Sequence, residues 1–444
     1  APLIPVDLPI DEFEIVDPER TDNFPNVLVL TLEGVIPSAI SAYGQRNLED
    51  GRIATPALDS IARDSTIFTN ARAAYPSTWD AWLMINTGRF IRVTEMDNIL
   101  SFEDRYSRHN NLVKILRQTG VTRWCHAHSP AYSQIIVGPE RHTINFEEDE
   151  PYAEITEEES ERGMYRGEKH VERVARFLDS LEPGEKFYIS EHMADSHFPW
   201  YRTEDAQAEF MGYPEGLSWA EKDGMQHDED HLSYLQEVTR MDWQIGLMLE
   251  DLKERGLYED LMIIIVGDHG CQWLEHGHKY YPGHLYDPAL RIPVMIKFPG
   301  IEGRGEEDPV DVPVIQMDLL TTLADLAGVA HSNEEVTGPF PGCTLRPFML
   351  GEETQADYDK CAQRDMLLST HYDMVGFIDD FKYKLIADRV TGTYFLFDLV
   401  NDPGETENLV DSHPEVFEQM LEGLRQKNRA EPAFFAGVAR SDSE

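Results

Sequence analysis

The stretch that decides the predicted fold is IIIVGDHG, residues 263–270. Its first four residues are apolar and predict a buried strand, and Asp268 and His269 follow directly after its end. Open α/β folds bind ligands at the carboxyl ends of such strands, so Asp268 and His269 are candidate metal ligands. Asp-His-Gly after a strand is also ordinary loop sequence, so this segment alone does not distinguish a metal site from a loop.

A second apolar strand is predicted from NVLVLTLEGV, residues 26–35, and Glu33 is its single acidic residue. An unpaired carboxylate inside a protein costs several kcal/mol, so a buried Glu33 needs a cation or an arginine beside it. The alternative is that Glu33 lies in solvent just beyond the strand.

The third informative segment is AAYPSTWDAWLMINTGRF, residues 73–90. Pro76, Ser77 and Thr78 predict a turn and the start of a helix. A hydroxyl group there faces free backbone N–H groups and the positive end of the helix dipole, which suits a nucleophile that attacks an anionic ester. The alternative is that Ser77 or Thr78 is only the N-cap of the helix.

With these segments, the chain resembles the sulfatase family of the alkaline phosphatase superfamily over nearly its whole length. Other matching motifs, in the family's order and spacing, are TPALDSIARDSTIFTNARA (55–73), NTGR (86–89), LYDPALRIPVMIKFPG (285–300) and LFDLVNDPGETENLV (396–410). The resemblance implies an α/β fold with a large mixed, mostly parallel sheet flanked by helices, and a small carboxyl-terminal α+β subdomain. It leaves the substrate open, because this superfamily uses one scaffold for sulfate esters, phosphate esters, phosphonates and phosphoryl transfer.

Two departures from the sulfatase pattern resemble another branch of the superfamily. Gly34 follows Glu33 where sulfatases carry paired Asp residues, and Thr78 occupies the position of the Cys or Ser that sulfatases convert to formylglycine. Threonine cannot undergo that conversion. The pattern resembles lipoteichoic acid synthases and phosphoethanolamine transferases, in which one metal is held by a Glu, a Thr nucleophile, an Asp and a His. This resemblance implies the metal ligands Glu33, Thr78, Asp268 and His269.

Candidate substrate-binding residues lie in FYISEHMADSHFPWY, residues 187–201, a predicted short strand followed by polar residues. His197 begins a His-aromatic-Pro-aromatic motif similar to that of the same branch, whose His contacts the ester oxygens or the leaving group. His284 matches the family's Lys or His before the LYD motif, at a shorter spacing. The resemblance implies catalytic roles for Thr78, His197 and His284 and substrate binding by His192, Asp195, His197 and His284. Loop capping is the alternative for His192.

The implied ligands suit one divalent ion, manganese or zinc rather than calcium, which prefers oxygen ligands alone. Such an ion would activate the Thr78 hydroxyl to attack a phosphoester, and water or an acceptor alcohol would resolve the phosphothreonine intermediate. The predicted function is a metal-dependent phosphoester hydrolase or phosphotransferase that acts on a small-molecule, lipid-linked or glycan-linked anionic ester. The alternatives are a sulfatase with an atypical nucleophile and a noncatalytic binding member of the family.

Three regions are predicted along the chain. Residues 1–25, rich in Pro, Asp and Glu, predict an extended acidic lead-in, residues 26–330 the catalytic domain, and residues 331–444 the carboxyl-terminal subdomain. In the last region, MVGFI (374–378) and TYFLF (393–397) predict a small antiparallel sheet, and residues 414–427 predict a closing helix.

The 444 residues include 82 acidic and 38 basic side chains, a formal net charge of -44. Such a surface repels nucleic acid, which excludes a nucleic-acid partner. It is typical of proteins from a high-salt cytoplasm or environment, and an acidic secreted or calcium-rich surface protein is the alternative. No apolar run is long enough to predict a membrane span, so the chain fits either a soluble protein, cytoplasmic or exported, or an excised extracellular domain.

The four cysteines, Cys125, Cys271, Cys343 and Cys361, lack the spacing of metal ligands. They predict no disulfide framework in a chain of this size. Cys271, beside the candidate site, is predicted to be a small packed residue.

Overall fold

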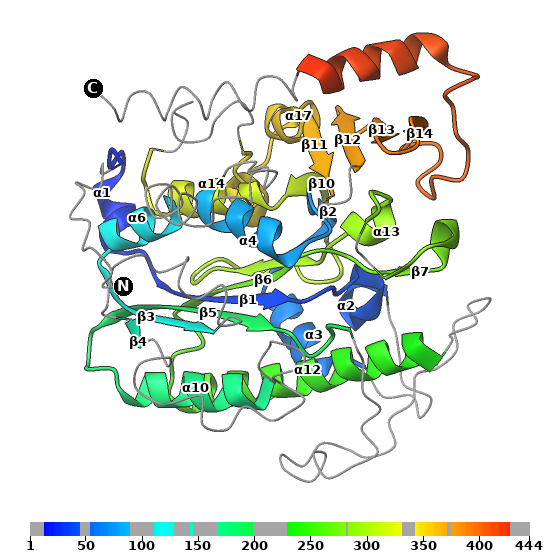
Figure 1. Cartoon of the computed structure of the whole chain (residues 1–444). Coiled ribbons are helices and arrows are strands. Elements are labelled where there is room, and N and C mark those ends of the chain that lie inside the picture. Colours follow the sequence, from blue (N-terminus) through cyan, green and yellow to red (C-terminus); the bar gives the residue numbers. More distant parts are fainter. Residues whose placement is uncertain are drawn as a thin grey trace, which may run out of the picture.

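An eight-stranded sheet forms the centre of the protein, with helices on both faces (Figure 1). The structure is a computed structural model that describes residues 13–44, 54–88, 111–127, 143–144, 167–198, 229–280, 283–330, 342–370 and 374–426. The strands are β1 (Asn26–Leu32), β2 (Thr66–Arg72), β3 (Val121–Ala127), β4 (Thr143–Ile144), β5 (Lys186–Met193), β6 (Leu261–Gly267), β9 (Val294–Lys297) and β10 (Val310–Ile315). Their order is β10-β2-β9-β6-β1-β5-β3-β4, and only β9 is antiparallel to its neighbours among these described strands. The predicted mixed, mostly parallel sheet is confirmed.

The central strands β6, β1 and β5 position the candidate site. Their near-continuous apolar sequences are explained by helices that bury both faces of the sheet. Leu32 of β1 pairs with Met193 of β5 on one side and with Gly267 of β6 on the other, so the three strands end at the same level. Residues that follow these strands therefore meet at one edge of the sheet.

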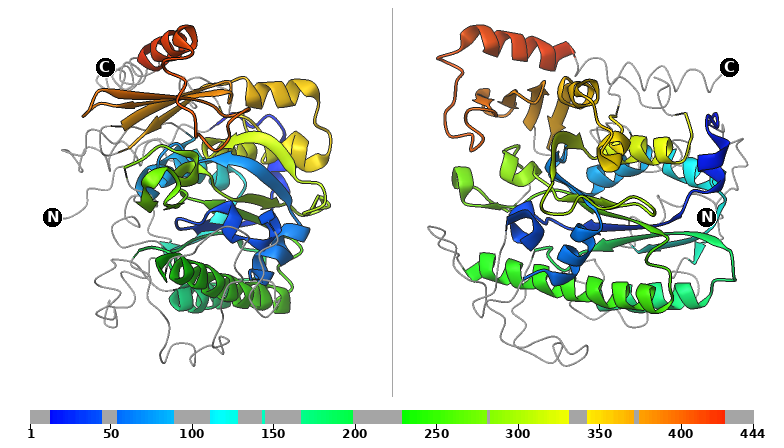
Figure 2. Two further views of the ribbon diagram at one scale, coloured as in Figure 1. Left: turned by 90° about the vertical axis from the view of Figure 1, so that its right-hand side faces the viewer. Right: turned by 180° about the vertical axis from the view of Figure 1, so that it is seen from behind.

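Two helical layers enclose the sheet (Figures 1 and 2). Helices α3 (Pro56–Arg63), α10 (Gly167–Asp179) and α12 (Glu229–Glu254) cover one face, and α4 (Thr78–Thr87), α6 (Asn111–Gln118) and α14 (Met317–Leu326) cover the other. Alternate β1 residues serve the two cores: Leu28 and Leu30 pack toward the first layer, and Val27 and Val29 toward the second. Within the described residues, no helix has both the length and the apolar character needed to cross a bilayer.

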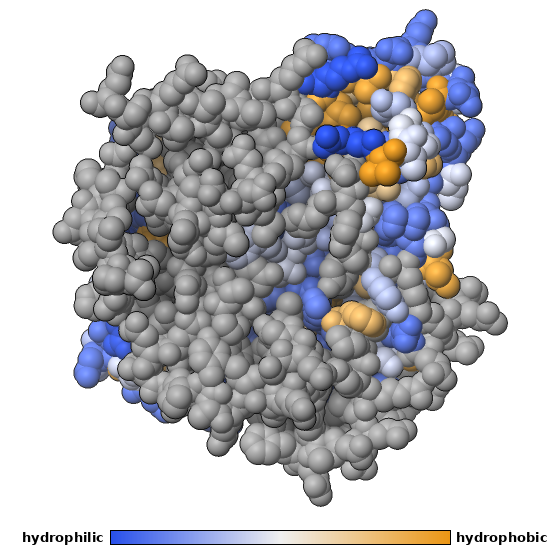
Figure 3. All heavy atoms as spheres, in the orientation of Figure 1, coloured by the Kyte–Doolittle hydropathy of each residue, from blue (hydrophilic) through white to orange (hydrophobic). Residues whose placement is uncertain are grey.

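The carboxyl-terminal region contains a four-stranded antiparallel sheet, in the order β11 (Met366–Ser369), β12 (Met374–Asp379), β13 (Tyr383–Asp388) and β14 (Thr393–Asp398). A helix of residues 414–426 follows, and this confirms both the predicted sheet and the predicted closing helix. On the face shown in Figure 3, hydrophilic residues cover much of the described surface of this region, with smaller apolar patches between them.

A buried ion-pair network joins this small sheet to the large one. Lys384 of β13 is 0% exposed, and its Nζ lies 2.7 Å from Asp287 Oδ1 and 2.6 Å from Glu405 Oε1. Asp287, the first residue of α13 (Asp287–Leu290), also accepts hydrogen bonds from the guanidinium group of Arg72 in β2. Burial by itself would raise the pKa of the Asp287 carboxyl group, but the charges of Arg72 and Lys384 outweigh it and lower this pKa.

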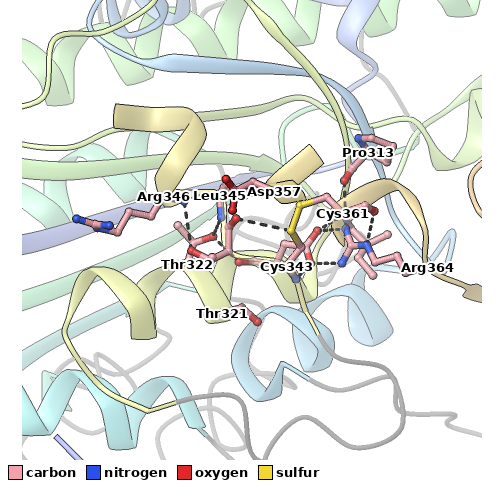
Figure 4. The surroundings of a disulfide bond; sticks show 12 residues. Pro313, Thr321, Thr322, Cys343, Leu345, Arg346, Asp357, Cys361 and Arg364 are labelled. Carbon is pink, nitrogen blue, oxygen red and sulfur yellow. Dashed lines mark hydrogen bonds and ion pairs between the residues drawn. A yellow bond between two sulfur atoms is a disulfide. The ribbon is translucent and has the colours of Figure 1, made fainter. Parts of the chain in front are cut away.

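A disulfide between Cys343 and Cys361 corrects the prediction that the cysteines form none (Figure 4). Cys343 is held where its backbone N–H donates to Asp318 Oδ1, and Cys361 lies on α17 (Gln355–Ala362), with a Cα–Cα distance of 5.4 Å. Arg364 donates to the same Asp318 carboxylate and to the Pro313 carbonyl. The pair is brought together by folding of the chain onto α14, which cysteine spacing does not reveal.

The lead-in also differs from its prediction within the residues that the structure describes. Helix α1 (Pro18–Asp22) interrupts the extended conformation, because Pro18 suits the first turn and Asp17 caps the helix by accepting from the Arg20 backbone N–H. Residues 331–341, with which the predicted carboxyl-terminal subdomain begins, lie outside the described residues.

Candidate active site

Glu33 lies inside the protein at the end of β1, with 0% exposure, so the alternative of a solvent-exposed position is wrong. Its backbone N–H continues the pairing with β5 by donating to the Met193 carbonyl at 3.1 Å. The next residue, Gly34, has φ +60°, a conformation that favours glycine, and its N–H donates to Asp268 Oδ1 at 2.8 Å. The turn after β1 is thus tied to the turn after β6.

Asp268 and His269 are also fully buried, and their outer hydrogen bonds orient them. Asp268 Oδ1 accepts from the N–H groups of Gly34 and His269, which leaves Oδ2 buried without a hydrogen bond. The Nδ1 of His269 lies 2.9 Å from the Gly270 carbonyl, a contact in which only the imidazole can donate. Its Nε2 then faces Glu33 Oε1 at 3.3 Å.

Thr78 is the first residue of α4, and Ser77 occupies the N-cap position, so Thr78 is not the cap. The Thr78 hydroxyl donates to Glu33 Oε2 at 3.0 Å and lies 3.4 Å from His269 Nε2. The structure therefore brings together Glu33, Thr78, Asp268 and His269, at the positive end of the α4 dipole.

His192 lies within β5, opposite Thr31 of β1, rather than in a loop after the strand. Its Nε2 is 2.9 Å from Glu33 Oε2 and 3.6 Å from Asp268 Oδ2. Sequence reasoning assigned His192 to the substrate and missed its contact with these carboxylates. The pairing of His192 with Thr31, two residues before Glu33, would have indicated this contact. That pairing can be predicted only when the order of the strands in the sheet is known.

The other predicted substrate residues have contacts of their own. Asp195 is buried and accepts a hydrogen bond from Gln244 at 3.2 Å, and His197 Nδ1 lies 2.5 Å from the Phe198 carbonyl. His284 stacks on His278 with a 3.4 Å separation between ring centroids. Their substrate-binding roles stay predictions.

Opposing charges decide the protonation of the buried cluster. Burial by itself would raise the pKa of Glu33, but the close contacts of its carboxylate with the His192 and His269 rings, at 2.9 and 3.3 Å, hold this pKa well below its usual range. Burial by itself would lower the pKa of each histidine, but Glu33 and Asp268 raise the pKa of His192 and of His269 to about 9. Two carboxylates are thus balanced by two cationic rings, a charge balance that a bound dication would also provide.

The donor set fits a divalent ion. One donor atom each from Glu33, Asp268 and His269 lies within 4.8 Å of the other two, and all three residues are buried. Glu33 Oε1 and Asp268 Oδ2 are buried acceptors without a hydrogen bond, which is costly unless a cation satisfies them. Hard carboxylate oxygens with an imidazole nitrogen are typical ligands of manganese or zinc.

Cys271 confirms the prediction of a small packed residue. It is a free, buried cysteine, and burial raises the pKa of its thiol well above the usual value. Such a thiol is a poor nucleophile, which agrees with a packing role for Cys271.

Two family profiles match the chain. The profile of the sulfatase family matches residues 25–329, and one described as N-sulphoglucosamine sulphohydrolase, C-terminal, matches residues 275–430. The ulvan-active sulfatase of Formosa agariphila is 22% identical over 451 residues, which cover 95% of this chain and 84% of that protein. The arylsulfatase of Clostridium perfringens is 24% identical over 280 residues, which cover 56% of this chain and 54% of that protein.

Solved structures share the fold. One, described in complex with its substrate D-glucosamine-2-N,6-O-disulfate, has a TM-score of 0.64 at 16% identity and covers 92% of this chain and 98% of its own. The phosphonate monoester hydrolase of Agrobacterium radiobacter has a TM-score of 0.59 at 17% identity and covers 91% of this chain and 96% of its own. At these identities the likeness establishes the fold alone, and the narrower resemblance to lipoteichoic acid synthases stays a prediction.

Proposed function

Because the chain belongs to the sulfatase family, we propose that it is a metal-dependent hydrolase that cleaves a sulfate ester at the cluster of Glu33, Thr78, Asp268 and His269. The names of the relatives favour this substrate over the phosphoester that sequence analysis placed first. The observation that carries the proposal is the hydrogen bond from the Thr78 hydroxyl to Glu33 Oε2, because it joins the proposed nucleophile to a candidate ligand.

The chain's own residues prepare Thr78 for attack. Glu33 accepts the hydroxyl proton in a hydrogen bond, and the amino end of α4 stabilises negative charge on Oγ1. A bound dication would neutralise charge on the ester oxygens, with Glu33, Asp268 and His269 as its ligands. Attack by Oγ1 on sulfur breaks the ester S–O bond, forms a sulfated Thr78 and releases the alcohol. Attack by water on the same sulfur then breaks the S–Oγ1 bond, releases hydrogen sulfate and regenerates the Thr78 hydroxyl. His197 is proposed to donate to the ester or the leaving group.

The proposed substrate is a sulfated glycan. One relative is named an ulvan-active sulfatase, and one structural neighbour is described with a disulfated glucosamine as its substrate. Both names describe sulfate carried by a sugar, and we extend that class to this chain.

A phosphoester substrate is the second candidate, and the identity of the nucleophile favours it. Threonine has a single hydroxyl group, so a sulfated Thr78 has no second hydroxyl on the same carbon to expel sulfate and depends on water attack at sulfur. A phosphothreonine is released by water or by an acceptor alcohol through the same kind of displacement that formed it. A noncatalytic role is disfavoured by the retention of a buried hydroxyl beside the candidate ligands.

Turnover of p-nitrophenyl sulfate, phosphate and phenylphosphonate with added manganese, zinc or calcium tests the proposal. We expect chelator-sensitive turnover of the sulfate ester above that of the others, and its loss in Thr78→Ala. Faster turnover of phosphate or phosphonate would establish the second candidate instead. No metal-dependent turnover of any ester, together with no metal binding, would overturn both.

A further inference from the structure

We propose that His192 is a further ligand of the ion held by Glu33, Asp268 and His269, binding through Nε2 and giving the site a second imidazole. This inference rests on the proposed function, since it concerns the same ion. It differs from the sequence prediction, which assigned His192 to substrate binding.

The separations between donor atoms carry the proposal. His192 Nε2 lies 2.9 Å from Glu33 Oε2 and 3.6 Å from Asp268 Oδ2. His269 Nε2, already a candidate ligand, lies 3.3 Å from Glu33 Oε1 and 3.6 Å from the same Asp268 oxygen. The two imidazole nitrogens thus lie at the same distance from Asp268 Oδ2, and each lies within 3.3 Å of one oxygen of Glu33.

These distances are those expected around one ion. Donor atoms about 2.1 Å from a common ion lie about 3.0 Å apart at a right angle and about 3.6 Å apart at an angle of about 120°. The contacts of Thr78 Oγ1 with Glu33 Oε2 at 3.0 Å and with His269 Nε2 at 3.4 Å fall in the same range. His192 Nε2 thus lies as close to Glu33 and Asp268 as the other candidate ligands lie to one another.

The sheet explains why this donor comes from β5. Gly34 offers no side chain, and a Cβ added there would lie 3.6 Å from the His269 ring in a backbone conformation that strains other residues. An acidic residue directly after Glu33 is therefore disfavoured. His192 reaches the cluster from the strand paired with β1, and its ring is buried at 2% exposure and lies nearly perpendicular to the ring of Trp82.

Two imidazoles change the expected metal preference. Calcium binds almost entirely to oxygen, whereas zinc, cobalt and manganese accept nitrogen ligands. A site with two nitrogens should therefore select a transition metal, and calcium should fail to displace it.

Proton NMR of the Co²⁺-loaded full chain counts the bound imidazoles, because each imidazole on high-spin Co²⁺ gives its own contact-shifted ring N–H signal. Histidine labelled with ¹⁵N identifies these signals as ring N–H protons. We expect two signals in the wild type and one in His192→Gln. His269→Gln should also remove one signal and serves as the positive control.

His170→Gln is the matched negative control. Like His192, His170 is buried and pairs with a carboxylate, with its Nδ1 2.5 Å from Glu191 Oε2, but it lies on α10, away from the cluster. We expect His170→Gln to keep both signals and the wild-type affinity for Co²⁺. We expect His192→Gln to bind Co²⁺ more than about 100-fold more weakly, beyond the usual loss from removal of an outer-shell partner.

The outcomes separate this inference from the proposed function. A wild-type spectrum with one signal, unchanged by His192→Gln, would overturn the inference and leave the metal site intact. A chain that binds no Co²⁺, Mn²⁺ or Zn²⁺ would overturn the proposed function together with the inference. The wild-type count does not depend on the folding of any variant.

Discussion

The ammonium group of Lys384, fully buried in the small sheet, lies 2.7 Å from the carboxylate of Asp287, which also binds Arg72 of the large sheet. The two sheets are therefore joined by charges rather than by apolar packing alone. A buried pair of this kind adds little when complete, but removal of one member leaves the other charge unpaired.

Asp287→Asn should reduce the free energy of unfolding at pH 7 by about 3 kcal/mol, because Arg72 loses its carboxylate partner while Lys384 keeps Glu405. The pKa of Asp287 is lowered in the folded state, so its contribution is present above the unfolded-state pKa and is lost as pH falls through the folded-state pKa. The difference between wild type and variant should therefore stay constant from about pH 5 upward and shrink below about pH 4. Urea unfolding across this pH range measures it.

The matched control is Asp308→Asn, which removes an ion pair with Arg304. The Asp308 side chain in this pair is 67% exposed. Its cost should be at most about 1 kcal/mol. Equal costs for the two variants would contradict the special role of the buried network.

Thr78→Ala should lower turnover by about three orders of magnitude or more, because the hydroxyl proposed to attack the ester is lost. Thr78→Ser, which keeps a hydroxyl at the same position, should retain measurable turnover. Mass spectrometry of acid-quenched wild type should find the transferred sulfuryl or phosphoryl group on residue 78. Retention of most of the rate in Thr78→Ala would show that water or Ser77 attacks instead.

Asp268→Asn should abolish activity together with tight metal binding, since a neutral amide is a much weaker partner for a dication. Calorimetric titration should give one ion per wild-type chain. Saturation at 100 times the dissociation constant should stabilise the wild type by about 2.7 kcal/mol and the variant by much less. Two bound ions per chain would refute the single-ion site.

The Cys343→Ala/Cys361→Ala double variant should lose about 3 kcal/mol of stability, because the disulfide closes a loop with a sequence separation of 18 residues. Reductant should lower the melting temperature of the wild type and leave that of the double variant unchanged. An effect of reductant on both proteins would point to another cause.

Potassium chloride should raise the melting temperature. At a net charge of -44 the acidic side chains repel one another, and the screening length falls from ~10 Å at 0.1 M salt to ~3 Å at 1 M. Melting curves at increasing potassium chloride, compared with sucrose at equal osmolality, separate screening from general solute exclusion. A flat or falling midpoint would contradict the high-salt interpretation of the composition.

The apolar strands β1 and β6 could be predicted because their apolar residues are continuous and polar residues mark their ends. Their parallel pairing brings Glu33 and Asp268 together. The sequence predicted this proximity only through the family resemblance. Strand β5 was predicted to end too early. The end of β5 contains Glu191 and His192, which are both buried. Glu191 contacts His170, and His192 contacts Glu33.

Polar residues inside a strand normally indicate solvent or a loop, so their burial depends on partners from other elements. The disulfide could not be predicted for the same reason. The hydrogen bond from Cys343 to Asp318 holds Cys343 in place, and the sequence separation of Cys343 and Cys361 does not reveal this contact. Sequence periodicity indicates which face of an element is buried, but it does not indicate which distant polar group contacts that face.

The central place of β1 in the sheet also affects biosynthesis. β1 ends at Leu32, whereas its two sheet neighbours begin only at Lys186 and Leu261. At about 5–20 residues per second, a ribosome exposes this apolar strand for roughly ten seconds or longer before either partner emerges. Nascent chains should therefore engage a chaperone through β1, and the proposed ion can be captured only after the chain has been made as far as His269.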